Sequence, residues 1–231
     1  MRGARACDHA GMTTHETEAG LLFVGGGGHA LVLAEAAQPL FEQSGLKPVG
    51  CLDDDDHPAL SSGSGAVPRL GPLSELGRFA GEHLNWILAI GSPSVRRSVL
   101  NDLPGALTLG SAWTVVHPSA VVSPSAQLGR GVFVGPGAIV HARARVRDHA
   151  IINSGAIIEH QCEVGENAHV APGSVLGGEA VVEDDAMVGL GARVLPMRRI
   201  GAGAMVGAGA VVLENVDAGA TVVGVPAEPL A

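Results

Sequence analysis

The stretch that decides the fold is a run of six-residue blocks over residues 116–217: VHPSAV, VSPSAQ, LGRGVF, VGPGAI, VHARAR, VRDHAI, INSGAI, IEHQCE, VGENAH, VAPGSV, LGGEAV, VEDDAM, VGLGAR, VLPMRR, IGAGAM, VGAGAV and VLENVD. Every block begins with Val, Leu or Ile, and the fifth position is Ala, Ser or Cys in 14 of the 17 blocks. The exceptions are Val132, Arg198 and Val216. Such a fixed period indicates stacked repeats rather than a mixed globular core.

A period of six fits neither the 3.6 residues of a helical turn nor the alternation of a simple strand. It suits a short strand followed by a turn, and three such units close a triangular coil. The first residue of each block then points inward, and the fifth must be small because the turn leaves little room. The 17 blocks predict between five and six coils of a left-handed parallel β-helix. At one inward position the block VLPMRR carries Arg198, which predicts a distortion or a small external loop.

The residues before the repeat follow a different pattern. Apolar strands are expected at residues 21–24, 48–52 and 86–90, and helices at 30–43, 73–79 and 92–103, with a Ser/Gly/Pro-rich loop over 55–72. Strands that alternate with helices indicate a parallel sheet of the mononucleotide-binding kind. The predicted organisation is therefore a flexible tail (1–19), a short Rossmann-like βαβαβ domain (20–110) and the β-helix (111–231).

Composition excludes several classes of protein. The formal net charge of −9 lacks the basic face that a nucleic-acid-binding protein needs. No apolar run approaches the roughly 20 residues that span a bilayer, so no membrane partner is expected. The three cysteines, Cys7, Cys51 and Cys162, are scattered without metal-binding spacing. An odd, sparse set of this kind fits a reducing compartment and predicts a cytoplasmic protein.

A nucleotide site is predicted where the first three strands end. The glycines of residues 25–28 follow the first strand, and the next helix presents its amide end to a phosphate. An acidic pair follows the second strand and a glycine follows the third, at the edge where open α/β sheets bind ligands. An NAD site is the competitor, but this segment fits G-x-G-x-x-G/A only loosely. The candidate residues are Gly27, Gly28, His29, Asp53, Asp54 and Gly91.

His160 is the candidate general base, because its ordinary pKa of about 6.5 suits proton transfer near neutral pH. Glu159 and Gln161 flank it and can orient the ring, and one 18-residue coil further on lies Gly178, with open backbone. His169 is half a coil away and so faces another side of the prism. The two histidines meet one substrate only if two subunits lie side by side, which predicts an oligomer with sites between protomers.

A zinc site is the other possible use of histidines on a β-helix. It needs about three ligands that converge on the metal. His141, His149, His160 and His169 are 8, 11 and 9 residues apart, and these spacings do not stack on an 18-residue coil. We therefore expect no metal.

These motifs resemble the bacterial sugar acyltransferases that join a short Rossmann-like domain to a hexapeptide β-helix, in particular the nucleotide-aminosugar N-acetyltransferases and the sialic-acid O-acetyltransferase relatives. The resemblance spans residues 21–227. Its specific parts are Gly28-His29, Leu52-Asp53-Asp54, Ala89-Ile90-Gly91, His117-Pro118-Ser119-Ala120, residues 153–160, residues 165–169 and Gly224-Val225-Pro226-Ala227.

The resemblance implies acetyl transfer from acetyl-CoA to the amine of a nucleotide-linked amino sugar such as a UDP-4-amino-4,6-dideoxy-hexose, in a homotrimer. It implies His160 as the base, His169 against the acetyl group and Asn153 near the amine. Acetyl-CoA is expected to run past Gly178, Leu190 and Ala208.

One position departs from the pattern of these relatives. They usually carry an acidic residue directly after the base, where this chain has Gln161. Two alternatives therefore stay open: a hydroxyl acceptor, as in sialic-acid O-acetylation, and a non-catalytic scaffold that binds a nucleotide sugar.

Overall fold

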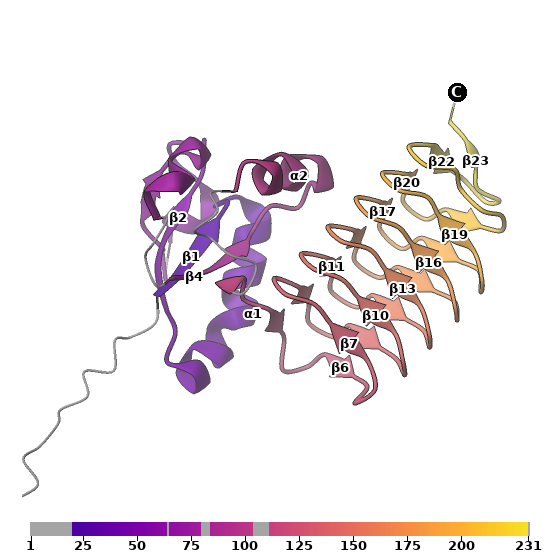
Figure 1. Cartoon of the computed structure of the whole chain (residues 1–231), viewed down its shortest axis with the longest axis horizontal. Coiled ribbons are helices and arrows are strands. Elements are labelled where there is room, and N and C mark those ends of the chain that lie inside the picture. The colour runs from indigo at the N-terminus through magenta and orange to yellow at the C-terminus, as the bar shows by residue number, and fades with distance from the viewer. Residues whose placement is uncertain (1–19, 64, 80–83, 104–110, 231) are drawn as a thin grey trace, which may run out of the picture.

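The structure, a computed structural model, describes residues 20–63, 65–79, 84–103 and 111–230. A small parallel sheet with two α-helices forms the first part, and a three-sided β-helix forms the second (Figure 1). The tail expected over residues 1–19 lies outside the described residues. None of the helices in the described part of the chain is long and apolar enough to cross a membrane.

The first part is a four-stranded sheet in the order β3-β2-β1-β4, with every pair parallel. β1 occupies the middle and is buried along its whole length, as its apolar sequence dictates. β3 lies inside the segment expected to be a loop, because residues 69–71 pair with the free edge of β2. The elements are β1 (Gly20–Val24), α1 (Gly28–Ser44), β2 (Lys47–Leu52), η1 (Ala59–Ser61), β3 (Arg69–Gly71), η2 (Leu73–Phe79), β4 (Leu84–Leu88) and α2 (Pro93–Asn101).

The hexapeptide repeat forms a prism with three flat faces, each a parallel sheet of mostly two-residue strands. The docking face, which lies against the first part, consists of β5 (Val115–Val116), β8 (Phe133–Val134), β11 (Ile151–Ile152), β14 (His169–Val170), β17 (Met187–Val188), β20 (Met205–Val206), β22 (Thr221–Val223) and the antiparallel β23 (Glu228–Pro229). The apolar face consists of β6 (Val121–Val122), β9 (Ile139–Val140), β12 (Ile157–Ile158), β15 (Val175–Leu176), β18 (Arg193–Val194) and β21 (Val211–Val212). The charged face consists of β7 (Gln127–Leu128), β10 (Arg145–Val146), β13 (Glu163–Val164), β16 (Val181–Val182) and β19 (Arg199–Ile200).

The core of the prism is the column of residues predicted to point inward. Val134, Ile152 and Val170 follow one another at 18-residue intervals in paired strands and are fully buried. The small fifth-position residues, such as Ala156 and Cys162, are buried beside them. This regular stack confirms the predicted β-helix.

The distortion predicted at Arg198 is wrong. Its peptide carbonyl accepts the ordinary hydrogen bond from Val181, and β19 pairs in register with β16. The guanidinium leaves the prism toward Glu214, with Nη1 3.9 Å from the carboxylate, so no loop is needed. The irregular coil comes later, where Val216 pairs with Ile200 after only 16 residues because the last block is shortened.

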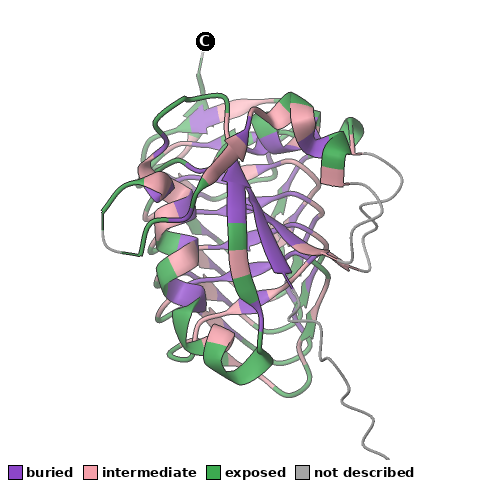
Figure 2. Ribbon diagram, turned by 90° about the vertical axis from the view of Figure 1, so that its left-hand side faces the viewer, coloured by how far each residue is buried: buried purple, intermediate pink, exposed green. Residues whose placement is uncertain are grey.

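The two parts share a continuous apolar contact. Outward-facing Phe133 and Ile151 of the docking face are buried in one cluster with Leu33 of α1 and Phe23 of β1. The opposite side of α1 is exposed, whereas β1 and the C-terminal ends of β2 and β4 are buried (Figure 2). The docking face therefore holds the small parallel sheet and its helices against the first coils of the prism.

Candidate active site

The turns between the faces form three edges of the prism. The distal edge (residues 123–126, 141–144, 159–162, 177–180 and 195–198) joins the apolar and charged faces. The proximal edge (117–120, 135–138, 153–156, 171–174, 189–192 and 207–210) joins the docking and apolar faces, and the clasp edge (129–132, 147–150, 165–168, 183–186, 201–204 and 217–220) joins the charged and docking faces. In a triangular prism the distal edge lies opposite the docking face.

His160 lies exposed on the distal edge, directly below the backbone of the next coil. A Cβ atom added to Gly178 would lie 2.6 Å from both Cε1 and Nε2 of the His160 ring. Only glycine therefore allows the imidazole to lean along the edge in this way. The structure brings together the two residues that 18-residue spacing had paired.

The neighbours of His160 do not hold its ring. The Glu159 carboxylate lies 3.8 Å from Nε2 of His141, one coil back on the same edge. Gln161 occupies the left-handed corner position with φ of +58° and is exposed. The sequence pattern assigned His141 no role apart from the rejected zinc site. Its distance of 18 residues from Glu159 is the signal that predicts their contact.

His169, by contrast, belongs to a closed network on the docking face. The side-chain oxygen of Asn153 accepts from the Ser154 amide at 2.8 Å, which leaves its Nδ2 to donate to Nε2 of His169 at 3.1 Å. The His169 Nδ1–H then donates to the Gly91 carbonyl at 2.9 Å. This network fixes the tautomer of His169 and connects the end of the small sheet to Asn153 on the proximal edge.

Burial keeps the histidines of this region neutral. Desolvation, followed by the charges of His169 and Arg96, lowers the pKa of His29 to about 4. Desolvation, followed by Arg96, lowers the pKa of His169 to about 4. The ring centroids of His29 and Phe133 lie 5.5 Å apart in an edge-to-face contact, and Nε2 of His29 is buried with no hydrogen-bond partner among the described residues. His29, one of the predicted nucleotide-site residues, therefore keeps one ring nitrogen free of protein partners within the residues that the structure describes.

The glycine-rich turn presents open backbone at the start of α1. Gly27 is the N-cap residue, and a Cβ added to Gly27 or Gly28 would meet nothing within 4 Å. Asp53 holds the turn, since its carboxylate accepts from the Gly26 amide at 2.6 Å. Asp54 instead accepts from the Leu73 amide at 2.9 Å and so supports the start of η2. The two aspartates, predicted as a pair, therefore point to different partners.

A buried arginine clasp, which the sequence analysis missed, joins α2 to the clasp edge. Arg96 is fully buried, and its guanidinium donates to the side-chain and backbone oxygens of Asn167, both at 2.6 Å. Beside it, Arg97 pairs with Glu166 and Asp185 at 2.8 Å each. Desolvation lowers the pKa of Arg96 to about 10, so it stays charged at neutral pH. The one local signal is Asn167 itself, a residue type that tolerates the left-handed turn position it occupies.

The residues predicted along acetyl-CoA lie on two different edges. Leu190 and Ala208 are exposed and stacked on the proximal edge, where the Gly209 amide donates to the Leu190 carbonyl at 2.7 Å. Gly178 lies on the distal edge. The predicted catalytic residues and the predicted nucleotide-sugar residues are likewise separated, because His160 lies across the prism from Gly91 and His169.

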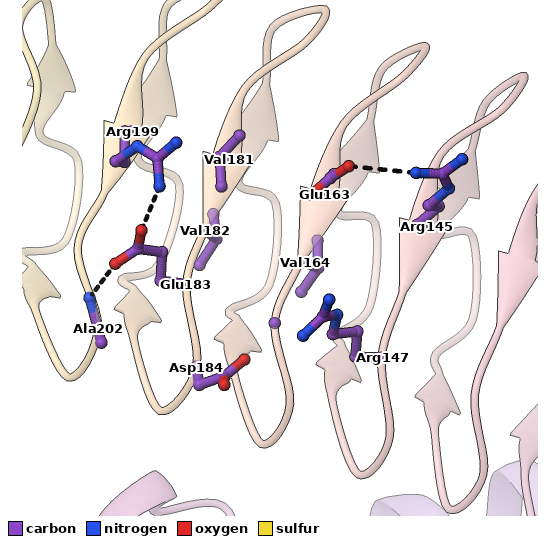
Figure 3. A pocket seen from close by; sticks show the side chains of 11 residues that line it. Arg145, Arg147, Glu163, Val164, Val181, Val182, Glu183, Asp184, Arg199 and Ala202 are labelled. Carbon is purple, nitrogen blue, oxygen red and sulfur yellow. Dashed lines mark hydrogen bonds and ion pairs between the residues drawn. The ribbon is translucent and has the colours of Figure 1, made fainter.

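A hollow on the charged face contains none of the predicted site residues (Figure 3). Two of its three arginines are already paired, Arg145 with Glu163 and Arg199 with Glu183. This hollow is therefore a surface groove lined by ion pairs, and it does not belong to the candidate site around His160. Among the described residues, no group of three His, Cys, Asp or Glu side chains is arranged to hold a metal ion.

A β-helix with an exposed histidine packed against a glycine of the next coil, and a small parallel α/β sheet on the opposite face, defines the class of hexapeptide-repeat acyltransferases. Comparison with known domains agrees: residues 20–103 match the PglD N-terminal domain, and residues 111–208 match the GMPPB C-terminal domain. No curated protein sequence matches the chain.

Solved structures give the closer comparison. GDP-perosamine N-acetyltransferase (PerB) of Caulobacter crescentus, solved with CoA and GDP-perosamine, is 34% identical, with a TM-score of 0.79 over 92% of this chain and 97% of that one. The acetyltransferase domain of PglB from Neisseria gonorrhoeae FA1090 is 32% identical, with a TM-score of 0.80 over 91% of this chain and 99% of that one, and it has also been solved with acetyl coenzyme A. The chain therefore belongs to the family of hexapeptide-repeat sugar N-acetyltransferases that act on nucleotide-linked amino sugars.

Proposed function

We propose that the chain transfers the acetyl group of acetyl-CoA to the amine of a nucleotide-linked amino sugar, at a site formed between two protomers of a homotrimer in the cytoplasm. The observation that carries the proposal is the distribution of the candidate residues over the prism. All of those on the β-helix, except His169, lie on the two edges that border the apolar face. His160 lies on the distal edge, and Asn153 lies on the proximal edge of the same coil.

The apolar face gives a physical reason for three prisms to associate. Its outward-facing side chains are aliphatic except for Arg193, and Val121 is 61% exposed. When three prisms turn this face toward a common axis, the proximal edge of each protomer meets the distal edge of the next. The aliphatic residues are Val121, Ile139, Ile157, Val175 and Val211.

This arrangement brings the separated residues together in one seam. Asn153 of one protomer then lies opposite His160 of the next. Leu190 and Ala208 continue along the same seam beside Gly178, a path that suits the extended shape of acetyl-CoA. The glycine-rich turn, His29 and Gly91 lie next to the proximal edge and would hold the nucleotide end of the sugar substrate.

The chemistry follows from these positions. The amine nitrogen attacks the thioester carbonyl, the bond from carbon to nitrogen forms, and the bond from carbon to sulfur breaks. His160 accepts the amine proton and returns a proton to the departing thiolate, a role worth about 10²- to 10⁴-fold in rate. The second N–H of the Asn153 amide remains available for the substrate, while His169 holds the first. Backbone amides near Gly178 are available to stabilise the oxyanion.

The two cysteines among the described residues fit a reducing compartment, and neither is suited to act as a nucleophile. Cys51 and Cys162 are buried free thiols. Burial raises the pKa of Cys162 to about 11, so this thiol does not ionise at neutral pH. Direct attack by the amine is therefore the economical mechanism.

The test is CoA release from acetyl-CoA with a panel of UDP-, dTDP- and GDP-linked 4-amino sugars, each with the native chain and with His160→Ala. We expect turnover with one of the amino sugars and a loss of at least about 10²-fold in the variant. Turnover only with the matching hydroxy sugars would show that the acceptor is a hydroxyl group rather than an amine. Full turnover in His160→Ala would remove His160 as the base.

A further inference from the structure

The proposed base lacks a charged partner at the two positions beside it in the sequence. Gln161 carries no charge, and the Glu159 carboxylate is directed to His141 at 3.8 Å. An imidazole that accepts a proton becomes a cation, and a carboxylate within reach stabilises that charged form. The coil above His160 supplies such a carboxylate.

We propose that Glu179 is the positioning residue for His160, an inference that rests on the proposed function. The Glu179 amide donates to the His160 carbonyl at 2.9 Å, which fixes the two residues in adjacent coils. Gly178, the residue before it, lies directly against the Cε1–Nε2 edge of the His160 ring. Because consecutive Cα atoms are about 3.8 Å apart, the Glu179 side chain starts beside the imidazole.

The Glu179 carboxylate is also unengaged. Among the described residues it has no hydrogen bond and no ion pair, and it is exposed at a left-handed corner with φ of +61°. The other carboxylates nearby already face a different side chain, Glu159 at 3.8 Å from His141 and Glu163 at 3.4 Å from Arg145. Among the described residues, the charged and titratable groups on and beside this edge, apart from His160, are His141, Arg143, Arg145, Glu159, Cys162, Glu163, Glu179, Arg198 and Arg199. Of the acidic ones, only Glu179 is left to turn toward the imidazolium.

Its role in the reaction is electrostatic. While the amine proton resides on His160, the ionised Glu179 faces the imidazolium and lowers its free energy. Glu179 itself neither gains nor loses a proton. Removal of this carboxylate should therefore move the acid limb of the pH profile of kcat to lower pH.

The first measurement is the pKa of His160 by proton NMR, with the signal assigned by its loss in His160→Ala. We expect Glu179→Gln to lower this pKa by about 0.5 to 1 unit at low salt, and less in about 1 M salt because the pair is exposed. This measurement needs no substrate, so it tests the inference even if the proposed reaction fails.

The second measurement is the pH profile of kcat with the amino sugar that the native chain accepts. Glu179→Gln should lower kcat by about three- to tenfold, move the acid limb down with the NMR pKa, and leave KM nearly unchanged. The double variant Glu179→Gln/Gln161→Glu should restore both, because it moves the charge to the same corner position one coil below, directly after His160 in the chain. Glu214→Gln, which removes an equal charge further along the β-helix, is the matched control.

Two results would overturn the inference. One is that Glu179→Gln leaves both the His160 pKa and the pH profile of kcat unchanged, while His160→Ala is inactive. This result would overturn the role of Glu179 but not the proposed function. The other is the same shift produced by Glu159→Gln instead, which assigns the partner role to Glu159.

Discussion

Gly178 lies against the imidazole of His160 so closely that a Cβ atom there would be 2.6 Å from Nε2. Gly178→Ala should therefore push the ring from its position without opening the coil. We expect kcat to fall by about 10²-fold, as small displacements of a reacting group do, while the melting temperature stays within a few degrees. Gly77→Ala, where an added Cβ meets nothing within 4 Å, should keep full activity. Native kcat in Gly178→Ala would contradict the placement of the base.

The apolar face should decide the oligomeric state. Ile157 faces outward from β12 in the middle of this face, and a charge there would be buried at the proposed axis. We expect Ile157→Glu to yield monomers by light scattering and to lose turnover. Val181→Glu, an outward position on the charged face, is the control and should remain trimeric. A trimer that survives Ile157→Glu would require a different face at the axis.

The arginine clasp should hold the two parts of the chain together. Replacing buried Arg96 by Met leaves the two Asn167 oxygens without their donor, which should cost about 1 to 3 kcal/mol of unfolding free energy for each oxygen. Because the inner core of the prism is separate from the cluster that the small sheet shares with the docking face, calorimetry should show the first part unfolding before the β-helix. Arg97→Gln, which breaks half-exposed pairs, should cost at most about 1 kcal/mol. Equal losses for the two variants would contradict this account.

Acid should destabilise the protein between pH 6.5 and pH 4. Burial lowers the pKa of His149 to about 4, as it does for His29 and His169. The unfolded chain therefore binds more protons than the folded chain in this window, so stability falls as the pH drops through it. Above pH 6.5 all three histidines are neutral in both states and this loss disappears.

His149 gives the sharpest test of that acid dependence. Its ring stacks on Trp86 with the ring centroids 5.2 Å apart, and its Nδ1 is buried with no hydrogen-bond partner in the described part of the chain. His149→Phe keeps an aromatic ring and removes both the unpartnered nitrogen and the titration. We expect the difference in melting temperature between pH 7 and pH 5 to shrink in this variant. An unchanged difference would show that His149 does not contribute to acid sensitivity.

The fold could be predicted from the sequence because the hexapeptide period directly encodes which residues point inward. Strand β3 could not, since the three residues Arg69–Gly71 gain their strand structure from pairing with β2 rather than from their own composition. The distortion predicted at Arg198 does not occur, because a long side chain at an inward position can extend out of the prism at the corner and place its charged end outside.

Contacts within the candidate site could be predicted from the sequence only between residues that are one full coil, or 18 residues, apart. The 18-residue interval paired His160 with Gly178, and the half-coil interval separated it from His169. The clasp between Arg96 and Asn167 depends on how α2 docks on the prism, and contacts across 71 residues leave no periodic signal. Likewise, the direction of Glu159 toward His141 depends on its rotamer.

Each proposed site takes residues from two protomers, and mixed trimers test this arrangement most directly. His160→Ala and Asn153→Ala should each be nearly inactive alone. Co-expressed in equal amounts, they should recover about a quarter of the native turnover, because random mixing then gives that fraction of seams an intact His160 and an intact Asn153. No recovery above the separate variants, in trimers shown to be mixed, would contradict a site between protomers.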